Sequence, residues 1–205
     1  MYNPEQESAL YFVPGLMAII LIMISALLTS LTLTREKETG TMEQLLVSPI
    51  RPWEVVIGKI VPYIVIAALD GVLILVVGRI FFGVTISGSA LFLAASGVIY
   101  IVTSLALGLI FSTFARTQQQ AMMMTLPATM MPTVILSGFI FPLRSMPLFL
   151  QGVSRIIPAT YFLQLIRGIV LKGVGPVALW QPLAGLAGLG IVFLTVSIVK
   201  FRTKL

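Results

Sequence analysis

The stretch LTREKETGTMEQLLVSPIRPWEV, residues 33–55, is a charged island in a chain that otherwise has few charges. It holds seven of the 20 Lys, Arg, Asp and Glu residues, and these are Arg35, Glu36, Lys37, Glu38, Glu43, Arg51 and Glu54. Once Lys59 is included, four acids balance four bases. A helix that only rests on lipid is usually rich in Lys and Arg. The balance therefore favours contact with a protein, although a plain interfacial helix stays an alternative.

Long uncharged runs surround this island. The chain is 58% hydrophobic and 10% charged, with a mean hydropathy of +1.07, whereas soluble domains have about 25% charged residues. Uncharged runs of 27, 36, 27 and 27 residues cover 8–34, 80–115, 117–143 and 173–199. A membrane-spanning helix needs roughly 20 mostly apolar residues. The sequence therefore predicts an all-α polytopic membrane protein.

We expect about five spans in one transmembrane domain, residues 1–205. The spans are placed at about 10–34, 60–82, 90–115, 121–141 and 178–199. The 36-residue run is divided near Gly83–Ser89, where Gly and Ser favour a tight reversal. Residues 35–59 then form a segment on one side of the membrane, and residues 142–177 form short re-entrant or outer helices divided by Pro147 and Pro158.

The distribution of basic residues predicts the orientation, because Lys and Arg concentrate on the cytoplasmic side. With the N-terminus outside, eight bases fall inside, namely Arg35, Lys37, Arg51, Lys59, Arg116, Lys200, Arg202 and Lys204. Four fall outside, namely Arg144, Arg155, Arg167 and Lys172. We therefore expect a cytoplasmic C-terminus and a cytoplasmic charged island.

Within the island, the pattern predicts a short helix. Apolar residues recur at helical spacing, at Met42, Leu45, Leu46 and Pro49. Thr41 and Gln44 fit a capping box after Gly40. Pro52 suits the first position of the next helix, which is expected to run through Lys59 into the second span.

Two groups inside the expected spans are candidates for a translocation path. Asp70 lies deep in the second span, where an acid must face protein or water. It either contacts a substrate or cation, or bonds a neighbouring helix at Ser104 or Thr103. In the fourth span, the candidates are Met123, Pro127 and Met130, because prolines kink helices and Met side chains adapt to apolar ligands. Ordinary helix packing is the alternative for that group.

Several chemistries are disfavoured by what the sequence lacks. There is no Cys or His, which removes thiol and histidine catalysis and the usual zinc ligands. The sequence has no G-x-x-x-x-G-K-[ST] loop, so we expect no directly bound ATP. The basic residues are scattered, and no nucleic-acid partner is expected.

Three motifs together resemble one family. REKETGTMEQLLVSPIRPWEVVIGKIVPY (35–63), LSGFIFPLRSMP (136–147) and IIPATYFLQLIRGIVLKG (156–173) resemble, in order, segments of the ABC-2-type transporter permeases, the membrane subunits of ABC exporters. In that family a cytoplasmic coupling helix sits in a groove of the ATP-binding subunit. The resemblance implies that role for Glu36, Glu38, Gly40, Thr41, Met42, Glu43, Gln44, Leu45, Leu46, Ser48 and Pro49.

The resemblance also implies the partners and the function. It implies a permease subunit in the plasma (bacterial inner) membrane, not itself an enzyme, that exports a drug-like, lipid or other amphiphile while a separate ATPase binds ATP-Mg. A second permease would complete a homodimer or heterodimer, and a periplasmic adaptor is a further candidate partner. Family members usually have a further spanning helix and a large outer domain before this region. Three explanations therefore stay open: the sequence is a fragment, a truncated reading frame or a divergent short form. The alternative function is an ATP-independent secondary transporter or channel subunit.

Overall fold

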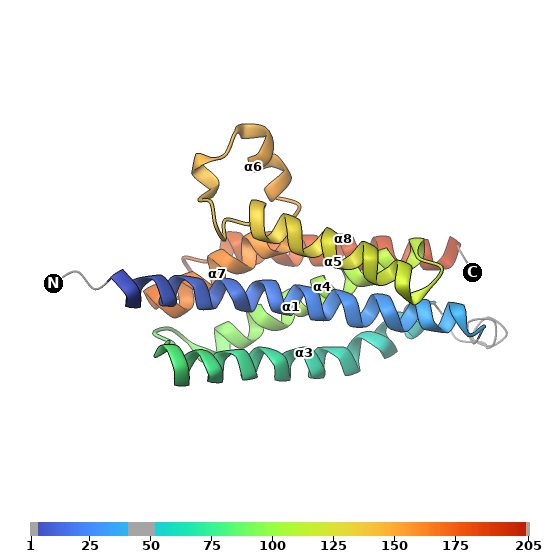
Figure 1. Ribbon diagram of the computed structural model, residues 1–205, viewed down its shortest axis with the longest axis horizontal. Coiled ribbons are helices and arrows are strands. Elements are labelled where there is room, and N and C mark those ends of the chain that lie inside the picture. The colour runs from blue at the N-terminus through green and yellow to red at the C-terminus, as the bar shows by residue number, and fades with distance from the viewer. Residues whose placement is uncertain (1–3, 41–51, 204–205) are drawn as a thin grey trace.

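The computed structural model describes residues 4–40 and 52–203 (Figure 1). Within these residues the chain forms seven α-helices, a short 3-10 helix and no strands. The long helices are α1 (Pro4–Glu38), α3 (Pro52–Phe82), α4 (Ala90–Phe114), α5 (Gln118–Leu136) and α8 (Trp180–Thr203). Between α5 and α8 lie η1 (Leu143–Ser145), α6 (Leu148–Ser154) and α7 (Pro158–Lys172). The prediction of an all-α fold is confirmed.

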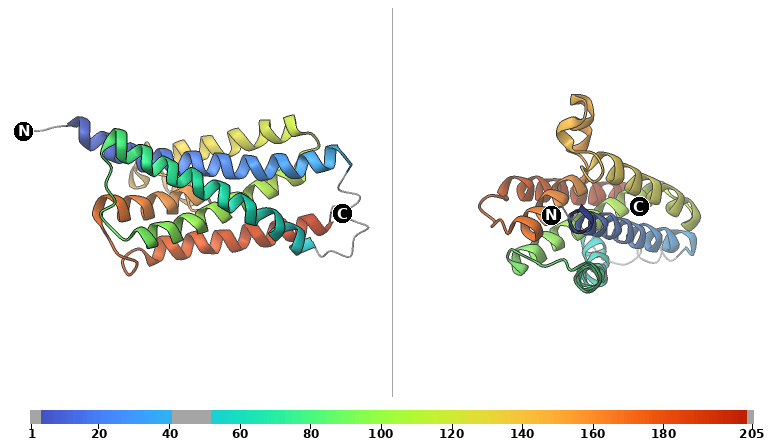
Figure 2. Two further views of the ribbon diagram at one scale, coloured as in Figure 1. Left: turned by 90° about the horizontal axis from the view of Figure 1, so that it is seen from below. Right: turned by 60° about the vertical axis from the view of Figure 1, so that its left-hand side comes forward.

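The long helices lie side by side in one bundle, with α1 and α4 at its centre (Figure 2). α1 packs against α3, α4, α5 and α7, and α4 also packs against α8. Because successive long helices reverse direction, the end of α1 meets the start of α3, the end of α4 and the start of α5. We call this the charged end, defined by Glu36, Lys37 and Glu38 of α1.

Close approach of α1 and α4 forms the core. A methyl group added to Gly108 of α4 would lie 2.2 Å from the Ala26 carbonyl oxygen of α1, so the two backbones touch there. Further along α4, the Tyr100 hydroxyl donates to the Ala18 carbonyl oxygen at 2.7 Å. The Tyr100 ring also stacks on Phe162 of α7, with ring centroids 4.1 Å apart. One tyrosine thus connects three helices.

Four helices of the described residues are long and apolar enough to cross a membrane, by length and composition. These four candidate spans are Phe12–Glu38, Ile57–Phe82, Ala90–Phe114 and Trp180–Lys200. In the α3 and α8 spans only 17% of the residues in the most apolar window are buried, as expected for helices that face lipid. Together with the hydropathy, this defines a multi-pass membrane protein.

The fourth expected span differs from its prediction. It is the 19-residue helix α5, which is not among those four spans and ends at Leu136 instead of continuing to residue 141. Threonines at 125, 129 and 133 lower its hydropathy, and all three are buried toward the bundle. The helix stops because Gly138 adopts φ +87°, a left-handed conformation that breaks the helix.

The segment before the last long helix contains short helices, as predicted. α6 begins directly after Pro147 and α7 begins at Pro158. α6 projects sideways from the bundle, whereas α7 lies within it (Figure 1). Arg167 of α7 donates to the Gly138 carbonyl oxygen at 2.9 Å and fixes the turn after α5. In the last turn of α7, the Val170 carbonyl oxygen accepts a hydrogen bond from the Ser87 amide.

Candidate functional site

The last turn of α1 carries three charged side chains that contact other helices. Glu36, Lys37 and Glu38 are consecutive, and consecutive residues of an α-helix point about 100° apart. The three side chains therefore point in three directions. Each one reaches a different helix.

Glu36 connects α1 to α3. Its carboxylate forms an ion pair with the Lys59 ammonium, near the start of α3. The two side chains are 26% and 16% exposed respectively, so solvent screens the pair less than a fully exposed one. This ion pair joins α1 and α3, the two helices on either side of residues 41–51, which the structure does not describe.

Lys37 connects α1 to the end of α4. Its ammonium donates a hydrogen bond to the Ser112 carbonyl oxygen, in the last turn of α4. Carbonyls in the last turn of a helix have no intrahelical donor and carry partial negative charge. A cation is therefore well placed there.

Glu38 connects α1 to the start of α5. Its carboxylate accepts hydrogen bonds from the backbone amide of Gln118 at 3.2 Å and from the Gln118 side chain at 3.0 Å. Free amides at a helix N-terminus favour an anion. Together the three side chains, which we call the α1 hub, join α3, α4 and α5 to one helical turn.

The hub changes the interpretation of two predicted docking residues. Glu36 and Glu38 were expected to contact an ATPase, and the structure shows both bonded within the chain. Gly40 is described, with φ +74° and open space around it. The other predicted docking residues lie outside the described residues, namely Thr41, Met42, Glu43, Gln44, Leu45, Leu46, Ser48 and Pro49.

The hub partners were not predicted from the sequence. Lys59 was recognised as part of the charge balance, but its pairing with Glu36 was not. Ser112 and Gln118 lie 75 and 80 residues from their partners. No local pattern marks such a contact, because helix packing alone sets it.

Asp70 lies on α3 at the edge of the face that packs on α1. It is partly exposed, and no hydrogen bond or ion pair reaches its carboxylate from the described residues. The suggested partners are engaged elsewhere: Ser104 and Thr103 donate to the Tyr100 and Ile99 carbonyl oxygens of their own helix. The proposed bond from Asp70 to either hydroxyl is therefore wrong.

The other predicted path residues lie on α5, away from Asp70. Met123 is 69% exposed and Met130 is 47% exposed, and Pro127 is exposed as well. α1 lies between α3 and α5 (Figure 2). Within one chain, Asp70 and the α5 residues therefore do not form a common site.

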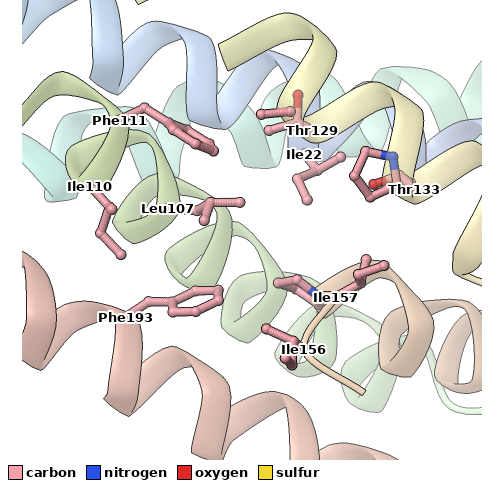
Figure 3. A pocket seen from close by; sticks show the side chains of 12 residues that line it. Ile22, Leu107, Ile110, Phe111, Thr129, Thr133, Ile156, Ile157 and Phe193 are labelled. Carbon is pink, nitrogen blue, oxygen red and sulfur yellow. The ribbon is translucent and has the colours of Figure 1, made fainter. Parts of the chain in front are cut away.

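A recess of about 290 Å³ lies on another side of α5. Figure 3 shows side chains from α1, α4, α5 and α8 and from the turn before α7 pointing into it, among them Ile22, Leu107, Thr129, Phe193 and Ile157. Its lining has no charged residue. The Thr133 hydroxyl also lines it and is buried, with no hydrogen-bond partner in the described structure. The recess can accept an apolar group but offers no catalytic constellation.

The described residues contain no group of three or more acids, His or Cys that could hold a metal. The fold and the hub define a multi-pass α-helical membrane protein in which the last turn of α1 contacts three other long helices. Comparison with protein families makes this specific: residues 2–171 match the ABC-2 type transporter family. The chain belongs to that family.

Related proteins are known from bacteria and from an amoeba. The chain is 35% identical over 204 residues to "Probable multidrug ABC transporter permease YbhS" of Escherichia coli, covering all of this chain and 54% of the relative. It is 33% identical over 203 residues to "Probable multidrug ABC transporter permease YbhR" of the same species, covering 99% and 55%. It is 27% identical over 173 residues to "ABC transporter G family member 20" of Dictyostelium discoideum, covering 84% and 24%. The chain thus spans about half the length of the bacterial relatives.

Proposed function

We propose that the chain is the membrane-embedded part of an ATP-driven ABC exporter. A separate subunit binds ATP and Mg²⁺, docks on residues 41–49, and drives efflux of a drug-like, lipid or other amphiphile across the plasma (bacterial inner) membrane. The N-terminus lies outside and the C-terminus in the cytoplasm. The observation that supports this best is the α1 hub, which borders the proposed docking segment and holds three further helices.

The hub gives a physical route for coupling. A displacement of residues 41–51 acts on both of their flanks, the end of α1 and the start of α3, which Glu36 and Lys59 hold together. Lys37 and Glu38 extend the displacement to α4 and α5. The helices then move as a connected set, as alternating access requires. The name of the YbhS relative, a multidrug permease, supports the substrate class.

A second permease, identical or different, completes the transporter in this proposal. An unpaired acid within a span costs on the order of 2.5–3.5 kcal/mol on insertion scales, so Asp70 requires protein or water around it. The described residues of one chain supply no partner. The exposed methionines Met123 and Met130 of α5 offer an adaptable apolar surface to a second subunit or a substrate. A periplasmic adaptor is a further candidate partner.

Docking is tested by co-purification with a candidate ABC ATPase subunit. Glu43→Arg and Leu45→Asp should each reduce retention of the ATPase at least about fivefold, because a reversed charge or a buried carboxylate at an interface costs 1 kcal/mol or more. Gln119→Asp is the matched control, because Gln119 is exposed at the charged end but outside the docking segment. Full retention by both docking variants would contradict the assignment.

Asp70 is tested by a nearly isosteric change. Asp70→Asn should lower ATP-driven efflux about tenfold while leaving assembly with the ATPase intact, because it removes the charge but keeps the shape. Efflux from inverted vesicles and co-purification measure the two properties separately. Loss of assembly would instead assign Asp70 to packing between subunits.

A further inference from the structure

A polar cavity of about 390 Å³ lies toward the end of the bundle opposite the charged end. It opens to the surface and is lined by η1, α6, the start of α7 and the start of α8. Unlike the apolar recess, it is lined mainly by hydrogen-bonding side chains, which are Gln151, Ser154, Arg155, Thr160, Tyr161, Gln164 and Gln181. It belongs to neither the hub nor the proposed docking segment.

The charge of this cavity has one sign. Arg155 is its charged residue, and its guanidinium makes no hydrogen bond or ion pair with the described part of the chain. Residues 71–205 contain nine Lys and Arg and no Asp or Glu. No carboxylate from this long portion of the sequence can therefore neutralise Arg155. An anion would be attracted here.

A buried donor points to the same conclusion. The Thr160 side chain is 3% exposed, and its hydroxyl has no hydrogen-bond partner in the described structure. Thr160 lies in the first turn of α7, whose N-cap residue Ile157 provides no side-chain cap. Pro158 has no amide hydrogen, and the Thr160 amide donates to the Ile157 carbonyl oxygen. The helix dipole and the unpartnered Thr160 hydroxyl are therefore what favour an anion at this terminus. Thr160 and Arg155 both line the cavity.

The surroundings indicate what kind of anion fits. Trp180, at the start of α8, is 61% exposed, and Leu148 and Phe149 of α6 are 85% and 79% exposed. Exposed tryptophan beside an apolar span is typical of the membrane–water interface. A ligand at this level can place a charged group in the cavity and apolar chains along these residues.

We propose that the cavity binds the phosphate group of an anionic amphiphile, held by Arg155, Thr160 and the glutamine amides. This site goes beyond the transport function, since binding needs neither ATP nor an ATPase. The same chemistry can come from a phospholipid headgroup or from free phosphate. Arginine suits phosphate because its fork of N–H donors matches the phosphate oxygens.

The test is titration of the purified full chain with phosphatidylglycerol, followed by native mass spectrometry. Phosphatidylcholine with the same acyl chains is the comparison lipid, because it retains the phosphate but is net neutral. Arg155→Gln should weaken phosphatidylglycerol binding about tenfold, the effect of losing a hydrogen bond to a charged group. Thr160→Val should weaken it by a smaller factor, and Arg155→Lys should retain part of the affinity.

Arg144→Gln is the matched control. It removes the same charge from the neighbouring helix η1, but Arg144 is exposed and does not line the cavity. It should bind like the wild type. Misfolding is not expected for Arg155→Gln, because the bond from the Tyr161 hydroxyl goes to the Arg155 backbone carbonyl.

Three results would overturn the proposal: equal loss in both arginine variants, equal affinity for the two lipids, or unchanged binding in Arg155→Gln. Competition with inorganic phosphate then distinguishes the two possible ligands, a phospholipid headgroup and free phosphate. Displacement of the lipid by millimolar phosphate shows that the phosphate group alone suffices. Retention of the lipid shows that the site takes a headgroup together with its chains.

Discussion

Gly108→Ala is expected to destabilise the bundle strongly, by placing a methyl group between the backbones of α4 and α1. The new Cβ would lie 2.2 Å from the Ala26 carbonyl oxygen and 2.8 Å from its Cα. These are backbone atoms, which cannot rotate away as a side chain can. α1 and α4 would have to separate along their whole contact, at a cost of about 3 kcal/mol, the upper part of the usual range for overpacking. Unfolding in mixed micelles, followed by circular dichroism, measures the loss.

Gly97→Ala is the matched control for this prediction. Gly97 lies on the same helix, but a Cβ there meets nothing within 4 Å, because it borders a cavity between α1, α3 and α4. The change should be neutral or stabilising by up to about 1 kcal/mol, the difference in helix propensity. If both variants unfolded alike, α1 and α4 would not be in backbone contact at Gly108.

Much of the architecture could be predicted because it follows from local physics. The uncharged runs located the long helices, since lipid tolerates few charges. Pro52 begins α3 as expected, and the segment Gly83–Ser89 separates α3 from α4. These features depend on a residue and its immediate neighbours. The sequence contains that information directly.

The span at α5 shows where local patterns mislead. Its uncharged run continues to residue 143, which led to an expected end at residue 141. The helix ends earlier because backbone conformation at Gly138, not hydropathy, terminates it. The threonines that lower its hydropathy are tolerated because they face the bundle. For example, the Thr125 hydroxyl bonds the Ser30 hydroxyl at 3.0 Å.

The site was predicted only in part for a different reason. Charge content marked the end of α1 as a candidate site, but a charge does not identify its partner. Glu36 and Glu38 were predicted to contact an ATPase subunit. The packing of α1 against three helices instead places their partners within the chain. Contacts between distant residues such as Lys37 and Ser112 exist only after the bundle has formed.

The pair of Glu36 and Lys59 allows the coupling role of the hub to be tested by charge exchange. Glu36→Gln should lower ATP-driven efflux about tenfold, equivalent to about 1.4 kcal/mol, because α1 and α3 lose their link beside the docking segment. Retention of the ATPase should not change. Efflux from inverted vesicles and ATPase co-purification measure these two effects.

The double variant Glu36→Lys with Lys59→Glu distinguishes an internal link from a docking contact. It restores opposite charges between the same two helices, so efflux should recover most of the loss. Arg35→Gln is the control in the same turn, because Arg35 is exposed and has no part in the hub, and it should transport like the wild type. A docking residue would behave differently, since a lysine at position 36 would meet the ATPase with the wrong charge whatever occupied position 59. A double variant as inactive as Glu36→Gln would therefore contradict the internal link and return Glu36 to the ATPase interface.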